Sequence, residues 1–138
     1  MKTIFIYILV IIFTSCSTKN KNTTTYDPLK RVWMMTEFQS FSKQYLFEKK
    51  ASLSLTDRES ASASMGCNDM SFPYKVSNKN SIQFFGGIST KMYCNDMTLE
   101  REFSKAIVKV KKYSISGHQL TLIAEDGSKM IFIAQDWD

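Results

Sequence analysis

Three cysteines are the residues of this chain whose type and position most directly predict chemistry. Cys16 follows Thr14-Ser15, two small residues that come directly after an apolar run over residues 4–13, and Lys2 supplies a basic start. A basic start, a short apolar segment and small residues before a cysteine are typical of a cleaved bacterial lipoprotein signal peptide. Cleavage leaves the cysteine as the first residue, with acyl chains such as palmitate on its sulfur and its amine. We therefore predict that the chain is lipidated at Cys16.

The same segment predicts where the protein resides. Its apolar run is about half as long as the roughly 20 residues that span a bilayer, which favours cleavage over the alternative of an uncleaved N-terminal anchor. Residues 1–16 are thus the predicted signal peptide, and the mostly polar residues 17–28 are a predicted flexible tether. Because Ser17 and Thr18 follow the cysteine in place of an aspartate, resemblance to lipoprotein sorting signals predicts the outer membrane, facing the periplasm of the bacterial cell envelope.

Once Cys16 is assigned to lipid, two cysteines remain, Cys67 and Cys94. An even number of cysteines in an oxidising compartment favours a disulfide. Two buried free thiols are the alternative. A nucleophilic Cys67 is a third hypothesis, but a nucleophilic thiol needs a base beside it. His118 is the single histidine of the chain, and it falls in a predicted Gly-His turn. We therefore predict no catalytic residue and no enzymatic activity.

Metal, cofactor and nucleic-acid sites are not predicted either. The chain has no Cys-x-x-Cys or His-x-x-x-His pair of the kind that binds zinc. Gly86-Gly87 lacks the Lys-Ser/Thr that follows the glycines of a phosphate-binding loop. Without the signal peptide, 17 basic residues stand against 13 acidic ones. This mild excess is unlike the dense basic surface of a nucleic-acid-binding protein.

Short segments that alternate apolar and polar residues dominate residues 29–138, which we expect to form one domain. Leu53 and Leu55, for example, alternate with serine and threonine, so both face one side of a sheet. The strands predicted in the first part of the domain cover Val32–Met35, Ala51–Thr56, Ala61–Met65, Phe72–Val76 and Ile82–Phe84.

The apolar period changes after Cys94. Leu99, Phe103, Ile107 and Val110 recur every three or four residues, which predicts a helix with one buried face. Three further strands separated by glycine-containing turns predict a C-terminal β-meander. These strands cover Tyr113–Ser116, Gln119–Ala124 and Lys129–Ala134. The predicted fold class is therefore α+β, a small curled antiparallel sheet or partial barrel with one helix packed across it.

Four basic residues share the helical spacing. Arg101, Lys105, Lys109 and Lys112 follow one another at intervals of four, four and three residues, away from the apolar stripe. The simplest interpretation is the solvated face of an amphipathic helix. The functional alternative is a surface contact with anionic lipid or with a cell-wall polymer close to the acyl anchor.

Two blocks around the cysteines carry a family resemblance. They are Met65-Gly66-Cys67-Asn68 and Thr90-Lys91-Met92-Tyr93-Cys94, and Glu100 and Phe103-Ser-Lys-Ala-Ile107 follow the second block. Together with Trp33 near the domain start, and with Leu120-Thr-Leu122 and Met130-Ile-Phe132 near its end, this ordered set resembles the META domain of HslJ-like heat-shock lipoproteins. The resemblance implies an exported α+β domain associated with stress tolerance. It supplies no catalytic residue, and its two motif cysteines fall on Cys67 and Cys94.

Two functions follow from these predictions. The first is a non-enzymatic envelope lipoprotein, held at the membrane by its lipid, whose domain is an interaction or stress-tolerance module with an envelope protein as partner. The alternative is a small barrel in the periplasm that binds an apolar ligand. A roomy apolar cavity would favour the ligand-binding barrel, whereas a filled core with an exposed apolar patch would favour the interaction module.

Overall fold

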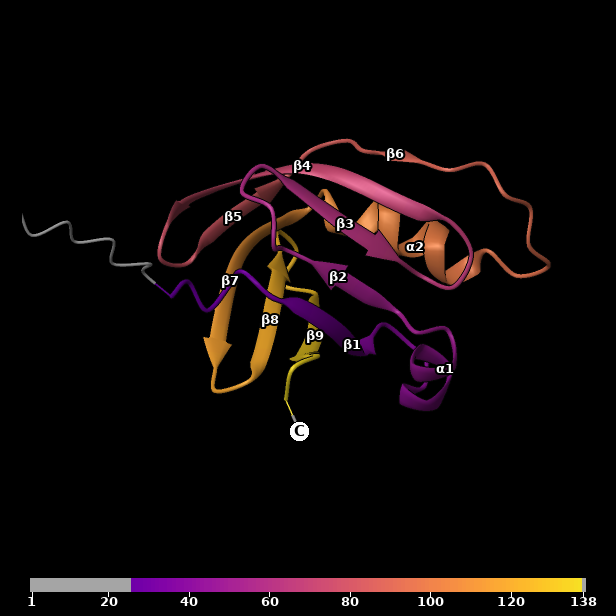
Figure 1. Cartoon of the computed structure of the whole chain (residues 1–138), viewed down its shortest axis with the longest axis horizontal. Helices are drawn as coiled ribbons and strands as arrows, with labels where there is room; N and C mark the ends of the chain where they lie inside the picture. The colour runs from indigo at the N-terminus through magenta and orange to yellow at the C-terminus, as the bar shows by residue number, and fades with distance from the viewer. Residues whose placement is uncertain (1–25, 138) are drawn as a thin grey trace, which may run out of the picture.

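A computed structural model describes residues 26–137 of the chain (Figure 1). The predicted signal peptide, the predicted lipidation site Cys16 and most of the predicted tether lie outside these residues. Within residues 26–137, no helix is both long enough and apolar enough to cross a membrane.

Nine antiparallel strands and two helices make up the described domain. Eight strands form a ring in the order β3-β2-β1-β9-β8-β7-β5-β4, and β4 pairs back onto β3. The ninth strand, β6, pairs with the beginning of β4. The strands are β1 (Val32–Phe38), β2 (Ser52–Ser54), β3 (Ser60–Ser64), β4 (Asp69–Asn78), β5 (Ser81–Phe84), β6 (Ile88–Ser89), β7 (Val110–Ser116), β8 (Gln119–Ala124) and β9 (Lys129–Ala134). The helices are α1 (Lys43–Glu48) and α2 (Thr98–Ile107).

The ring of strands is a closed barrel, so the prediction of an open curled sheet or partial barrel with a helix packed across it is wrong. The closing contact is the pairing of β3 with β4, which runs from Ser60 opposite Pro73 to Ser64 opposite Asp69. Alternating apolar residues show which face of a strand is buried, but they do not show which distant strand lies beside it. The sequence pattern therefore predicted most of the strands but not the closure.

Large apolar side chains fill the barrel. They come from the inward-facing positions of nearly every strand, and the indole N–H of Trp33 donates a hydrogen bond to the carbonyl of Leu29 at 3.0 Å. Buried tryptophan N–H groups usually have such a partner. The side chains that are fully or almost fully buried include Trp33, Leu53, Leu55, Ile82, Phe84, Leu120 and Phe132.

Helix α2 packs its apolar side against one end of the barrel. The ring of Phe103 meets Phe38, the last residue of β1, at 6.4 Å between centroids, and Phe72 in β4 at 6.0 Å, both edge to face. The predicted helix phase is confirmed, because Leu99, Phe103 and Ile107 are buried. The helix ends earlier than its spacing predicted, and Val110 is the first residue of β7.

Candidate functional site

The two cysteine-containing blocks meet where the barrel contacts the start of α2. Cys67, just before β4, forms a disulfide with Cys94, which lies in the segment between β6 and α2, and their Cα atoms are 6.1 Å apart. This confirms the predicted pairing over the alternative of two free thiols. Because both sulfurs are bonded to each other, neither cysteine is available as a nucleophile in this structure.

Asn68 lies beside the disulfide and holds the segment that leads from β6 to α2. Its side chain is almost fully buried, with an exposed fraction of 1%. Its Oδ1 accepts a hydrogen bond from the backbone N–H of Met92 at 2.7 Å and another from the hydroxyl of Thr90 at 2.8 Å. Its Nδ2 donates to the carbonyl of Met92 at 3.2 Å. One amide side chain thus fixes two residues of a long loop.

Glu100 links the same amide to α2. This carboxylate is only 7% exposed, although it belongs to the first turn of the helix. Its Oε1 accepts from Nδ2 of Asn68 at 3.0 Å, and its Oε2 accepts from the backbone N–H of Asn68 at 2.9 Å. Buried charges are usually compensated by hydrogen bonds, and these two serve that purpose. The cluster positions a loop, and it brings no nucleophile and base together.

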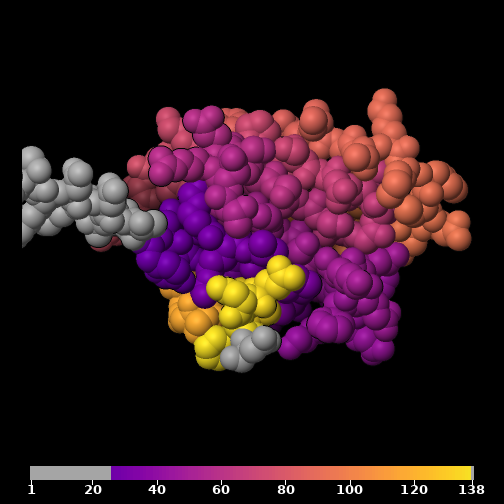
Figure 2. Space-filling view, viewed as in Figure 1, coloured from indigo at the N-terminus to yellow at the C-terminus, as the bar shows by residue number. Residues whose placement is uncertain are grey.

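The segment that this cluster holds exposes apolar side chains. Ile88, Met92 and Tyr93 are 78%, 57% and 90% exposed. Figure 1 shows the segment that contains β6 running along the outside of the domain, and its atoms form the protruding edge in Figure 2. A Cβ at Gly87 would lie 2.2 Å from the carbonyl oxygen of Ser71, so glycine is required where the segment approaches β4. We call residues 85–93 the pinned loop.

Reduction of the disulfide is expected to lower the free energy of unfolding by about 3–4 kcal/mol, because the bond closes a loop between cysteines 27 residues apart. Thermal unfolding with and without reductant measures the loss as a fall of several degrees. A variant with both Cys67→Ser and Cys94→Ser is the control, and its melting temperature should not respond to reductant. Two reactive thiols in the unfolded, unreduced protein would contradict the bond.

A second contact ties α1 to the start of α2. The hydroxyl of Tyr45 donates to Oδ2 of Asp96 at 2.5 Å, and Oδ1 of Asp96 accepts from the backbone N–H of Thr98 at 3.0 Å. The Tyr45 hydrogen bond, followed by those of Thr98, lowers the pKa of Asp96 to about 2. The hydrogen bond with Asp96, followed by burial, raises the pKa of Tyr45 to about 12.

This contact predicts a loss of stability in acid. A carboxyl whose pKa is lower in the folded than in the unfolded chain stabilises the fold above the unfolded pKa. That contribution is lost as pH falls from about 4, the usual value, to about 2. Urea unfolding at pH 6 and pH 2.5 measures the difference, which should be smaller in Tyr45→Phe. Carboxyl NMR of that variant should show the pKa of Asp96 moving back up, and an unchanged pKa would contradict the role of Tyr45.

The four basic residues with helical spacing do not share one helix. Arg101 and Lys105 are exposed on α2, Lys109 follows its end, and Lys112 belongs to β7. Glu102 lies 3.2 Å from Nζ of Lys105 and 3.7 Å from Nε of Arg101, so part of the positive charge is compensated. The four basic residues therefore do not form one continuous stripe on a helix, because they extend from α2 into β7.

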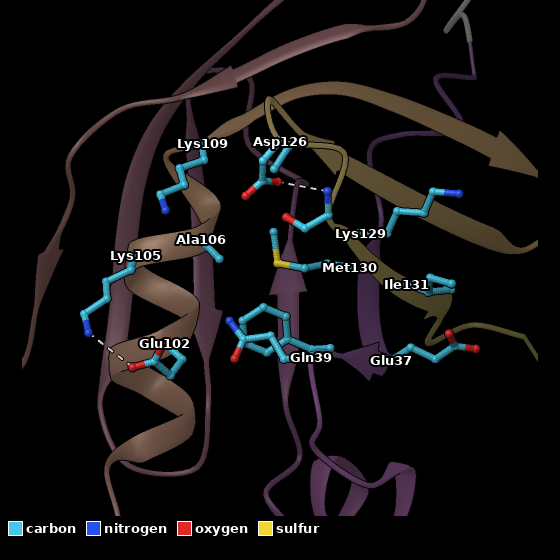
Figure 3. A pocket seen from close by; sticks show the side chains of 13 residues that line it. Glu37, Gln39, Glu102, Lys105, Ala106, Lys109, Asp126, Lys129, Met130 and Ile131 are labelled. Atoms are coloured by element: carbon cyan, nitrogen blue, oxygen red, sulfur yellow. Dashed lines mark hydrogen bonds and ion pairs between the residues drawn. The ribbon is translucent and has the colours of Figure 1, made fainter.

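A groove of about 510 Å³ lies beside α2 (Figure 3). Its walls carry three lysines, Lys105, Lys109 and Lys129, and three carboxylates, those of Glu37, Glu102 and Asp126. Because positive and negative side chains both line the groove, it favours neither an anionic nor a cationic ligand. Nowhere in residues 26–137 do three or more metal-binding side chains of His, Cys, Asp or Glu gather.

The contact between Asn68 and Glu100 was not predicted from the sequence. A signal for it was present, because Glu100, Phe103 and Ile107 are spaced by three and four residues. That spacing places the glutamate on the buried side of the helix. A charged residue at such a position requires a buried partner.

Comparisons with known proteins identify the family and support the fold. A family model for the META domain matches residues 27–137. The fold is similar to an NMR structure of a protein from Burkholderia xenovorans, with a TM-score of 0.60 and 16% identity, covering 81% of this chain and 90% of that one. It is also similar to a crystal structure of a DUF4847 family protein from Bacteroides vulgatus, with a TM-score of 0.56 and 12% identity, covering 80% and 96%. Curated proteins gave no match.

Proposed function

Because the chain belongs to the META domain family, we propose that it is a membrane-anchored, non-enzymatic envelope lipoprotein whose domain binds another envelope protein through the pinned loop. The family match agrees with the resemblance of the two cysteine blocks. The observation that carries the proposal is the exposure of Ile88, Met92 and Tyr93 on a segment that a disulfide and Asn68 hold in place. Aromatic residues and methionine are enriched at protein interfaces, and a preordered loop loses less entropy on binding.

The alternative function, a barrel that binds an apolar ligand, has less support. Trp33, Phe84 and Phe132 are buried in the described barrel, and Phe103 of α2 packs against one end of it. The groove of Figure 3 is open to solvent and bordered by charged side chains. An apolar ligand needs a largely apolar, concave site. The exposed apolar loop therefore favours the interaction module.

The anchor is tested at Cys16. Mass spectrometry of the mature protein should find an N-terminal acylated cysteine, and Cys16→Ala should move the domain out of the membrane fraction. Fractionation of the two membranes tests the outer membrane, which we propose as its location. An intact Met1 in the native protein would overturn the anchor.

The partner surface is tested by site-specific photo-crosslinking in intact cells. A photoreactive residue in place of Tyr93 should give a defined crosslinked species, whereas one in place of the exposed Ser116, the last residue of β7, should not. Ile88→Ala, added to the Tyr93 probe, should weaken the crosslink, because truncating an interface anchor typically costs about 2 kcal/mol or more. Equal crosslinking from both positions would reject the pinned loop as the binding surface.

We also propose that binding contributes to stress tolerance. Cells that lack the protein should survive heat or antibiotic exposure less well. The wild-type chain should restore survival, and a chain with both Ile88→Ala and Tyr93→Ala should not, although it reaches the same cell fraction. Full rescue by that chain would show that stress tolerance does not depend on the pinned loop.

A further inference from the structure

We propose that the end of the barrel at which the chain enters the domain binds anionic phospholipid headgroups and so orients the domain on its membrane. The inference deepens the proposed function and rests on the anchor at Cys16. It concerns a surface different from the pinned loop and from the basic residues of α2.

Three neighbouring hollows define this surface. Tyr26 and Asp27, the first described residues, line one of them together with Lys75. Asp27 also lines a second hollow, with Asn80 in the β4–β5 turn. Asn80 lines a third one with Lys112 of β7. The shared residues show that the three hollows lie side by side, and Figure 1 shows the β4–β5 turn on the side where the indigo chain begins. We call this surface the entry face; its basic residues are Lys30, Arg58, Lys75, Lys79, Lys111 and Lys112.

The entry face carries the excess positive charge of the described domain. Its six basic residues stand against three acidic ones, Asp27, Asp57 and Glu59, whereas the basic and acidic residues of the remaining described chain are equal in number. Two of the three carboxylates are engaged by backbone N–H groups. Oδ1 of Asp27 accepts from Leu29 at 3.0 Å, and Oδ1 of Asp57 accepts from Glu59 and Ser60 at 2.9 and 3.0 Å.

Three lysines of the entry face are free to meet a ligand. Lys75, Lys79 and Lys112 are exposed, and none of them forms an ion pair with another residue of the described domain. Lys75 points outward from β4, since its neighbour Tyr74 is buried. Long flexible ammonium side chains of this kind interact with phosphate as point charges.

The length of chain before Tyr26 determines which face lies near the bilayer. Nine residues lie between an acylated Cys16 and Tyr26, and the ten Cα–Cα steps span about 35 Å at most at full extension. The entry face is therefore the part of the described domain that is tethered nearest to the anchor. Strand β4 runs from Met70, which contacts Ser104 of α2, to Asn78 at the entry face. Because electrostatic attraction decays within about 8 Å in physiological salt, lysines at the opposite end of the domain, such as the one in α1 (Figure 1), act much more weakly on the lipid.

The expected effect is large enough to measure. A basic side chain near an anionic bilayer changes the partition coefficient by about fivefold. Neutralising three of them should therefore weaken binding by about 100-fold. Attraction of this kind also falls steeply as salt concentration rises.

Vesicle sedimentation with residues 17–138 tests the surface without an acyl chain, since residues 26–137 form the closed barrel with its own core. The protein should bind phosphatidylglycerol vesicles, bind phosphatidylcholine vesicles poorly, and dissociate from the former at 0.5 M salt. The triple variant K75Q/K79Q/K112Q should bind phosphatidylglycerol about 100-fold more weakly. Circular dichroism confirms that each variant is folded.

The matched control neutralises three exposed lysines away from the entry face, on α1, in the pinned loop and on α2. K43Q/K91Q/K105Q changes the net charge equally and should leave most of the vesicle binding intact. Equal losses in the two triple variants, or equal binding to the two lipids, would overturn the proposal. Binding to isolated lipopolysaccharide without binding to phosphatidylglycerol would overturn it too. Because this experiment contains no acylated cysteine, its failure is distinguishable from an unmodified Cys16, which mass spectrometry detects.

Discussion

Phe103→Ala is expected to lower the free energy of unfolding by about 3–5 kcal/mol, the usual cost of emptying a fully buried phenylalanine site. The ring is fully buried and meets both Phe38 and Phe72 edge to face. Its neighbours come from β1, β4 and α2, three elements that cannot all shift to fill the space. Urea unfolding of the purified domain measures the effect.

Lys105→Ala is the matched control for this prediction. It lies two residues away on the same helix, and its exposed side chain forms an ion pair with Glu102 at 3.2 Å. An exposed ion pair contributes little, so the expected change is below about 0.5 kcal/mol. Similar losses in the two variants would mean that α2 does not bury the face described above.

Asn68→Ala is the second large effect, again about 3–5 kcal/mol, because it removes the partner of a buried carboxylate. The side-chain amide that donates to Glu100 disappears, and the backbone N–H and carbonyl of Met92 lose their partner. Hydrogen exchange should accordingly show faster exchange in residues 88–97 than in the β7–β9 meander. Thr90→Val, which removes one donor to the same amide, should cost only about 1 kcal/mol.

Asn68→Asp separates charge from shape at this position. The variant keeps the size of the side chain but places a second carboxylate next to Glu100. Two adjacent carboxylates repel each other. The destabilisation should therefore be greatest at neutral pH and should shrink in acid. A pH-independent loss would show that repulsion between carboxylates is not its cause.

The sequence predicted individual elements better than their arrangement. The alternating residues of Ala51–Thr56 and the three-four spacing of Leu99 and Phe103 identified a strand and a helix, because each pattern depends on local geometry. The short helix α1 and the two-residue strand β6 were missed, since neither is long enough to show a period. Barrel closure was missed because the alternating pattern of β3, with small residues such as Ala61 and Ala63, does not identify β4 as its neighbour.

The candidate site was likewise predicted only in part from the sequence. Cys67 and Cys94 could be paired by counting, since an odd cysteine had already been assigned to lipid. The role of Asn68 could not be derived by counting, because its partners Met92 and Glu100 come from separate segments that meet only in the folded chain. The exposure of Tyr93 could not be predicted from the sequence either, since aromatic residues are more often buried.

The pairing of β1 with β9 has a consequence for the time at which this chain can fold. Trp33 lies opposite Ala134, so the first strand of the barrel is paired with the end of the last strand, about a hundred residues later in the sequence. A chain that crosses a membrane N-terminus first delivers β1 long before β9. The edge of β1 that pairs with β9 stays unpaired until β9 arrives. In the exported chain that we propose, both disulfide cysteines precede β7 and can be oxidised during transit. The ring can close only once β9 is available, and truncation before β9 would leave both β1 and β8 without their partner strand.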